Sequence, residues 1–162
     1  MFLQLSLPLP AEPFGVGWEA LQGRRKPLPG RVAASVFTFH RAFKLPRQLR
    51  PSLDGVTDEQ LRLRQRLLDE ETAEFATAAC RRDLVGMADA LADVVYVAYG
   101  TAATLGLDLD LVLDEVHRSN MSKLDERGRP VLRADGKVLK SSPRYVKPDV
   151  AAVIAGQPTL PF

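Results

Sequence analysis

Five carboxylates fall into two short runs whose spacing would gather them on helices. Glu70, Glu71 and Glu74 form the pattern Glu-Glu-x-x-Glu, and Asp89 and Asp93 lie four residues apart. Residues three or four apart share one side of a helix, where like charges repel. Such crowding favours a bound cation, and carboxylate oxygens suit Mg²⁺ or Mn²⁺ rather than zinc. The alternative interpretation is a solvated acidic helix face.

Cap signals mark the two helices that must carry these residues. Thr57 followed by Gln60 forms a capping box, which predicts a helix from there to about Cys80. Asp83 is a suitable N-cap for the next helix, and Gly106 suits the position after its end. The two acidic runs therefore lie on consecutive helices.

A short turn at residues 81–82 would make these two helices antiparallel. Glu74 and Asp89 each lie about seven residues from this turn, or about 10 Å at a rise of about 1.5 Å per residue. Both acidic runs then share one level, which predicts one metal site between the helices. A di-iron bundle is disfavoured, because neither His40 nor His117 follows a glutamate at the Glu-x-x-His spacing.

Apolar periodicity predicts two more main helices, over about 32–43 and 108–123. The helix beginning after Asp83 is apolar nearly all round from Val94 onward, so it should be central and should need a partner subunit to bury it. The predicted fold class is all-α: a helical bundle of four main helices, completed by oligomerisation, with an irregular basic C-terminal segment. The predicted buried stripe of the first helix comprises Val32, Val36, Phe39 and Phe43.

The chain divides into three predicted segments. Residues 1–30 contain five prolines and form an irregular arm. Residues 31–124 form the helical domain. Residues 125–162 form a basic segment that packs on this domain and ends in a short helix over about 149–155. Within it, Asp135-Gly136 marks either a small hairpin or an ordered loop.

Polar and basic residues after the fourth main helix have the chemistry to bind phosphate. Asn120 and Lys123 are three residues apart at its C-terminal end, where lysine also complements the helix dipole. Lysine binds phosphate as a point charge, and a solvated basic tail is the alternative. Tyr145 supplies an aromatic ring that could stack on a base. The basic residues of this segment are Lys137, Lys140, Arg144 and Lys147.

Composition limits the function classes. The 162 residues (17.8 kDa) suit one domain, and 46% hydrophobic with 26% charged residues is typical of soluble globular proteins. The single cysteine, Cys80, excludes an intrachain disulfide and a cysteine-based zinc site. Basic segments flank an acidic middle, so a continuous basic face for nucleic acid is not expected.

No membrane partner is expected either. The charge-free run over 94–107 is shorter than the about 20 residues that cross a bilayer. The first residues lack a basic leader and are broken by Pro8 and Pro10, which disfavours a secretory signal. We therefore expect a cytoplasmic protein.

The acidic pattern resembles a known signature. Glu70-Glu-Thr-Ala-Glu74 followed by Asp93 is similar to the Glu-Glu-x-x-Glu … Glu-x-x-Asp motif of the all-α nucleoside triphosphate pyrophosphohydrolases. The later run Ser119-Asn-Met-Ser-Lys123 resembles the MazG-like branch that is labelled phosphoribosyl-ATP pyrophosphohydrolase-like.

The resemblance implies a role for each matching residue. Glu71, Glu74 and Asp93 would ligate Mg²⁺, for which Mn²⁺ could substitute. Glu70 would ligate the metal or activate the attacking water. The residues that would contact the nucleotide phosphates or sugar are Asn120, Lys123 and Lys137.

Two positions depart from the family pattern. The acid expected three residues before Asp93 is Ala90, and Asp89, on nearly the same face, is the candidate substitute. The tail reads Lys140-Ser-Ser-Pro where the branch usually has Lys-Gly-Pro.

The expected activity is metal-dependent hydrolysis of a (deoxy)nucleoside triphosphate to the monophosphate and pyrophosphate. The expected role is house-cleaning of the nucleotide pool by a homodimer or homotetramer. Two alternatives stay open: hydrolysis of phosphoribosyl-ATP in histidine synthesis, and a non-catalytic helical module that binds nucleotide or nucleic acid through its basic flanks.

Overall fold

The computed structural model describes residues 30–136, 138–139 and 143–162, and this part is all-helical, as predicted. The proposed N-terminal arm lies almost wholly outside the described residues. Within the described part no strand forms, and one isolated antiparallel bridge joins Leu132 to Val138 across the predicted turn. The helices are α1 (Arg31–Ala42), α2 (Asp58–Cys80), α3 (Leu84–Leu105), α4 (Leu109–Met121) and α5 (Val150–Gly156).

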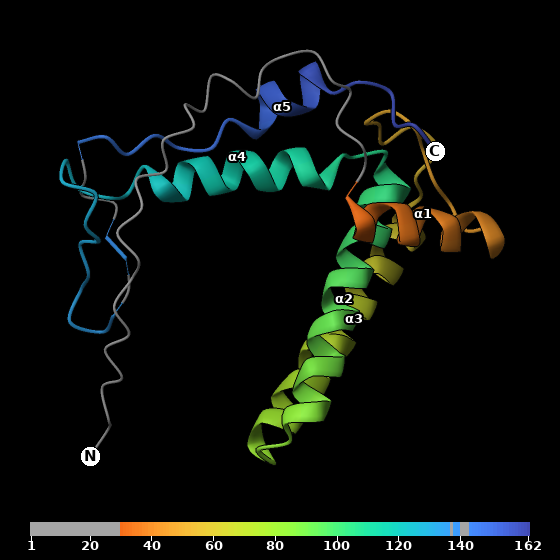
Figure 1. Cartoon of the computed structure of the whole chain (residues 1–162). Helices are drawn as coiled ribbons and strands as arrows, with labels where there is room; N and C mark the ends of the chain where they lie inside the picture. Colours follow the sequence, from red (N-terminus) through yellow and green to blue (C-terminus); the bar gives the residue numbers. More distant parts are fainter. Residues whose placement is uncertain (1–29, 137, 140–142) are drawn as a thin grey trace.

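Helices α2 and α3 form an antiparallel hairpin that projects from the rest of the molecule (Figure 1). The predicted capping box is present: the Gln60 amide donates to Thr57 Oγ1 at 3.2 Å, and the Thr57 amide donates to Gln60 Oε1 at 2.9 Å. Asp83 accepts hydrogen bonds from the first amides of α3. Gly106, with a left-handed φ of 68°, ends this helix as its sequence position predicted.

Helix α1 lies across the open end of the hairpin and packs on α3 (Figure 1). Its predicted buried stripe is partly wrong. Val36 is fully buried, but Val32, Phe39 and Phe43 are 39%, 37% and 65% exposed. Phe37 takes the core position instead, because the C-terminal tail supplies a ring that stacks on it: the Phe37 and Phe162 centroids are 3.9 Å apart.

Helix α4 leaves the hairpin at a steep angle and packs on α5 (Figure 1). Its first turn is fastened to the two neighbouring helices. Tyr99 Oη of α3 donates to Asp110 Oδ1 at 2.6 Å, and the Gly30 amide, at the start of α1, donates to Asp110 Oδ2 at 2.9 Å. The C-terminal end of α4 therefore lies far from the hairpin.

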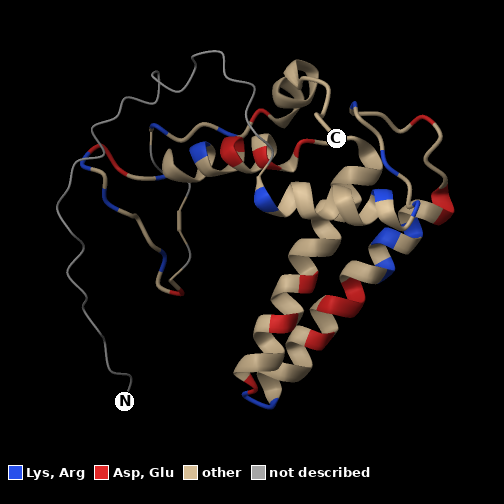
Figure 2. Cartoon of the chain, turned by 45° about the vertical axis from the view of Figure 1, so that its right-hand side comes forward, with Lys and Arg blue, Asp and Glu red and all other residues tan. Residues whose placement is uncertain are grey.

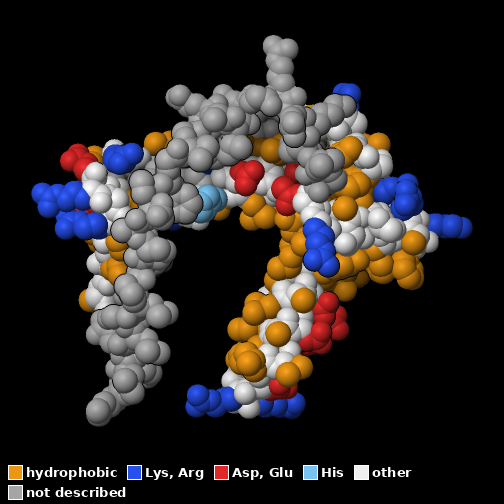
Figure 3. All heavy atoms as spheres, viewed as in Figure 1, with side chains coloured by type: hydrophobic (Ala, Val, Ile, Leu, Met, Phe, Trp, Pro, Cys, Tyr) orange, Lys and Arg blue, Asp and Glu red, His pale blue; other side chains and the backbone are white. Residues whose placement is uncertain are grey.

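The hairpin leaves apolar side chains exposed on its surface, on the side below α4 (Figure 3). Leu91 and Val95 of α3 are 51% and 45% exposed, although α3 is the most apolar of the four longer helices. By length and composition alone α3 could also cross a membrane, a test that the core helix of a soluble protein passes as well. Exposed apolar residues of α2 and α3 include Leu61, Leu63, Leu84, Val85, Leu91 and Val95.

Candidate functional site

The acidic residues of α2 and α3 lie at matching levels on the hairpin, as Figure 2 shows in red. Glu71 is half-buried and faces α3, whereas Glu70 and Glu74 on either side are exposed. On α3, Asp89 and Asp93 are exposed. Glu71 thus lies on the inner side of α2, and the four exposed carboxylates lie around it near enough to act on its charge.

Two contacts fix the register of the seam between α2 and α3. A Cβ added to Gly86 of α3 would lie 3.1 Å from Cβ of Ala78, and one added to Gly100 would lie 3.4 Å from Nη1 of Arg64. Gly86 is seven residues before Asp93 and Gly100 is seven after it, just as Ala78 and Arg64 flank Glu71. Glu71 and Asp93 therefore form the middle level between these two contacts, of which the one between Gly86 and Ala78 is tight and the one between Gly100 and Arg64 is ordinary packing.

Burial and the surrounding acidic residues together raise the pKa of Glu71. Burial is the largest cause, followed by the negative charges of Asp93, Glu74, Glu70 and Asp89. Desolvation and like charge both penalise an ionised carboxylate, so both act in the same direction. All four neighbours therefore act electrostatically on one side chain.

The donor set suits a hard divalent cation. Hard divalent cations prefer carboxylate oxygens, and within the described part of the chain none of the five makes an ion pair with lysine or arginine. The described side chains do not yet enclose an ion, because no three acidic, histidine or cysteine groups among them lie close enough to hold one.

Ala90, which departs from the acidic pattern, is buried. It is 2% exposed and lies in the seam between the helices. An ionised acid there would lose its hydration without a partner. Asp89, one residue earlier, stands at the exposed rim and keeps an acid at this level.

The predicted substrate-binding residues lie elsewhere in the chain. Lys123 Nζ donates to Asn120 Oδ1 at 2.6 Å at the C-terminal end of α4, and Tyr145, in the segment that returns along this helix, is half-buried. Because α4 points away from the hairpin, one chain does not bring Asn120 and Lys123 to the carboxylates (Figure 1). Lys137 and Lys140 lie outside the described residues.

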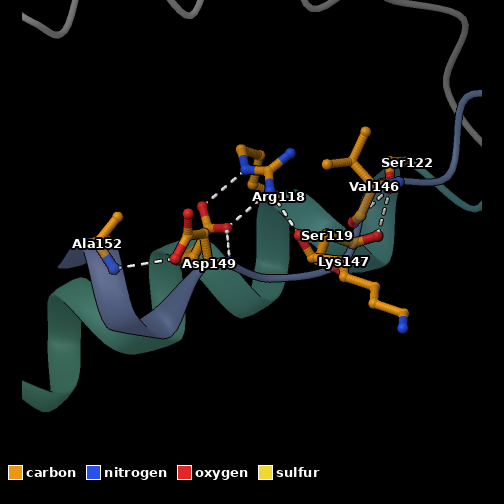
Figure 4. Close-up of polar contacts among 8 residues, drawn as sticks. Arg118, Ser119, Ser122, Val146, Lys147, Asp149 and Ala152 are labelled. Atoms are coloured by element: carbon orange, nitrogen blue, oxygen red, sulfur yellow. Dashed lines mark hydrogen bonds and ion pairs between the residues drawn. The ribbon is translucent and has the colours of Figure 1, made fainter. Parts of the chain in front are cut away.

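The segment after Tyr145 is held against α4 by a set of polar contacts (Figure 4). Glu115 accepts two hydrogen bonds of 2.7 Å from Arg118 and one of 2.6 Å from the Asp149 amide. This lowers the pKa of Glu115 to about 2, chiefly through the Arg118 hydrogen bonds. Ser122 Oγ accepts from the Val146 amide at 3.0 Å. The C-terminal segment thus holds a fixed position along α4.

Sequence reasoning did not single out Arg64 or Gly100. The signal was present: Arg64 lies seven residues before Glu71, so an arginine occupies the same inner stripe of α2 as the carboxylate. Glycine inside a helix costs up to about 1 kcal/mol, which favours a packing or functional reason for Gly100.

Comparison with known proteins identifies the family of this chain. Residues 36–120 match the family model described as phosphoribosyl-ATP pyrophosphohydrolase. The match spans all five carboxylates and ends within α4, at Asn120. No curated protein matches the chain. The family model matches more than half of the chain, and the described part of the chain is all-helical, with acidic residues on both helices of one hairpin. The chain therefore belongs to the phosphoribosyl-ATP pyrophosphohydrolase family of the MazG-like superfamily, and so to the pyrophosphohydrolases that act on acid anhydrides.

Proposed function

We propose that the protein is a cytoplasmic, Mg²⁺-dependent nucleoside triphosphate pyrophosphohydrolase that releases a (deoxy)nucleoside monophosphate and pyrophosphate. One observation supports this most directly: burial and the negative charges of four neighbouring carboxylates raise the pKa of Glu71, and within the described chain none of the five makes an ion pair with a basic residue. Retaining this repulsion costs stability, which a cation bound with the substrate would offset. A role in house-cleaning of nucleotide pools is consistent with this chemistry.

Each carboxylate has a proposed role. Glu71, Glu74, Asp89 and Asp93 would hold Mg²⁺ or Mn²⁺, which when bound neutralises phosphate charge and lowers the pKa of a water. Glu70, exposed at the edge of the cluster, would accept the proton of the attacking water. In-line attack would then break the bond between the α- and β-phosphates.

The separation of the two predicted residue groups supports a shared site. The proposed substrate-binding residues are Asn120, Lys123, Lys137, Lys140 and Tyr145. Those that the structure describes lie on or beside the C-terminal half of α4, which points away from the hairpin of the same chain. In a homodimer or homotetramer, the basic end of one α4 would reach the acidic hairpin of a second copy. Opposite charges on the two surfaces and the exposed apolar face of the hairpin favour this arrangement.

The decisive experiment is pyrophosphate release from a panel of canonical and modified (deoxy)nucleoside triphosphates, with Mg²⁺, with Mn²⁺ and with EDTA. Metal-dependent release is expected from at least one of them. Glu74→Gln should lower turnover by at least about a hundredfold, because losing a ligand forfeits several kcal/mol of charge stabilisation. Glu126→Gln, outside the cluster, is the matched control. Full activity of Glu74→Gln would contradict the assigned ligand set.

Phosphoribosyl-ATP is the second candidate substrate, and the description of the matching family favours it. It presents the same triphosphate to the same carboxylates, so only the nucleoside end differs. Release of pyrophosphate from phosphoribosyl-ATP, with none from the panel, would assign the protein to histidine synthesis. Nucleotide or nucleic-acid binding without turnover of either would instead favour a non-catalytic module, and a steep salt dependence would accompany nucleic acid.

A further inference from the structure

Arg64 of α2 occupies an unusual position at the junction of three helices. It is half-buried, and a Cβ added to Gly100 of α3 would lie 3.4 Å from its Nη1 and 3.1 Å from Nε2 of His40, on α1. The glycine thus lets the guanidinium and the imidazole approach the α3 backbone together. An alanine in its place would crowd the imidazole of His40 and would meet the guanidinium of Arg64 at ordinary van der Waals distance.

The junction is rich in positive charge and poor in negative charge. Among the described residues Arg64 makes no hydrogen bond or ion pair, and burial, with no acidic neighbour to oppose it, lowers its pKa. Burial is the largest cause that lowers the pKa of His40, and the positive charges of Arg64 and Arg47 lower it further. His40 Nδ1 is bonded to the Pro46 carbonyl at 2.8 Å, so the neutral ring donates there. A half-buried arginine without a carboxylate leaves its donors available to an anion.

The register of the hairpin places Arg64 on the same side of α2 as Glu71, facing α3. Arg64 lies seven residues, or about 10 Å, from Glu71 along α2, and Gly100 lies the same distance beyond Asp93 on α3. Arg64 therefore lies two helical turns from Glu71, towards the open end of the hairpin. Both residues are on the side of α2 that faces α3. A phosphate chain held at the carboxylates and running along the seam would extend towards this guanidinium.

We propose that Arg64 binds the terminal phosphates of the substrate, the part that leaves as pyrophosphate. A guanidinium presents paired N–H donors that match phosphate oxygens, which a lysine cannot reproduce. The inference rests on the proposed function and adds the direction in which the substrate binds. The leaving phosphates point towards α1, and the nucleoside points towards the hairpin turn. Arg64 then stabilises the charge that accumulates on the leaving group.

The test is calorimetric binding of inorganic pyrophosphate and of tripolyphosphate, in Mg²⁺, to the full chain. The variants are Arg64→Gln, Arg64→Lys and the matched control Arg66→Gln, which removes an exposed arginine from the same helix. Loss of a charge-assisted phosphate contact should weaken both ligands about tenfold or more in Arg64→Gln. Arg64→Lys should be intermediate, and Arg66→Gln should stay within about twofold because its effect is only screened, long-range charge. Mn²⁺ binding and the melting temperature of each variant report whether the hairpin is intact.

The outcomes separate this inference from the hydrolase proposal. Equal weakening in Arg64→Gln and Arg66→Gln would overturn it, as would unchanged binding in Arg64→Gln or no binding of either ligand by the parent protein at millimolar concentration. Selective weakening would support it even if no nucleotide of the panel is hydrolysed, in which case only the proposed reaction fails. With a hydrolysed substrate, Arg64→Gln should also weaken pyrophosphate inhibition without changing inhibition by the monophosphate product.

Discussion

Glu71 is the residue at which stability and the proposed function oppose each other. Its pKa is raised by burial and by four carboxylates, so the native state holds its proton more tightly than the unfolded chain does. The folded protein therefore loses stability as the pH rises from below 4.5 through the higher native pKa. Above that window the full repulsion is present unless a cation balances it.

Replacing Glu71 by glutamine should therefore stabilise the metal-free protein. In EDTA, the melting temperature of Glu71→Gln should exceed that of the parent at pH 7, and the difference should shrink as the pH falls towards 4. Added Mn²⁺ should raise the parent more than the variant, because the variant has lost a ligand. Calorimetry across this pH range, with Glu126→Gln as the control outside the cluster, measures both effects. A variant less stable than the parent in EDTA would mean that Glu71 is held by contacts that outweigh the repulsion.

Residue-scale sequence reasoning found the acidic cluster but missed Arg64. The carboxylates were predictable because helical spacing alone crowds them, and their repulsion demands a cause. The sequence alone does not distinguish Arg64 from its neighbours Arg62 and Arg66, which are solvated charges. Its difference from the other two depends on Gly100 and His40, which approach it only in the folded chain.

At the scale of single elements, Gly106 is essential to the end of α3. Its φ of 68° is costly for any residue with a Cβ, and a Cβ at this position would lie only 2.1 Å from the Arg50 carbonyl oxygen. Backbone atoms cannot move aside as a flexible side chain can. The connector through Arg50 and the end of α3 are therefore packed in a way that only glycine permits.

Gly106→Ala and Gly128→Ala separate these two effects. Gly128 has a similar φ of 72° but nothing within 4 Å of a built Cβ. Gly128→Ala should cost about 1–2 kcal/mol of unfolding free energy, the penalty of the left-handed conformation. Gly106→Ala should cost about 1–3 kcal/mol more, because the backbone must shift. Urea denaturation of both variants measures the difference, and equal losses would show that the Arg50 contact relaxes freely.

The attachment of the C-terminal segment to α4 should depend on pH. Hydrogen bonds from Arg118 and from the Asp149 amide lower the pKa of Glu115 from 4.5 to about 2. A depressed carboxylate pKa stabilises the fold above pH 4.5, and this contribution is lost as the pH falls towards 2.

Glu115→Gln should consequently lower the melting temperature at pH 7, and the gap from the parent should narrow as the pH falls from 4.5 towards 2. Asp114→Asn, a neighbouring exposed acid, is the control. Thermal unfolding followed by circular dichroism at several pH values measures both variants. A gap independent of pH would show that shape rather than charge makes this contact.

Element boundaries were predictable where side chains cap helices, and less so where packing decides. Thr57, Asp83 and Gly106 act locally, so the sequence predicted the ends of α2 and α3 closely. The buried face of α1 was displaced because Phe162, distant in sequence, covers Phe37. A local sequence pattern cannot show that a residue from the other end of the chain will pack on Phe37.

At the scale of the whole molecule, the direction of α4 separates the acidic hairpin from the basic segment. That direction could not be read from the sequence, because it depends on the contacts of Asp110 with Tyr99 and Gly30. A compact four-helix bundle and the observed open arrangement share the same apolar pattern. They differ in whether the exposed face of α3 is covered by the same chain or by another.

Complementation tests the proposed shared site. Glu74→Gln and Lys123→Ala should each be nearly inactive alone, whereas a mixture refolded together should recover about a quarter of the parent activity in a dimer with two symmetric sites. Leu91→Lys, on the exposed apolar face, should shift sedimentation towards the monomer and abolish the recovery. Leu53→Lys, an exposed leucine of the connector, is the control. A mixture as inactive as its components would place both residue groups in separate sites.

The two contacts that fix the register of α2 and α3 also restrict how related chains can differ in length. Inserting one residue into α2 between Arg64 and Ala78 would rotate the remainder of the helix by about 100°, and Glu71 would no longer share a level with Asp93. Only matched changes of about seven residues in both helices would preserve the seam. Loops and the C-terminal segment carry no such restriction. Length variation in this lineage should therefore collect outside the hairpin, whose helices would change together or not at all.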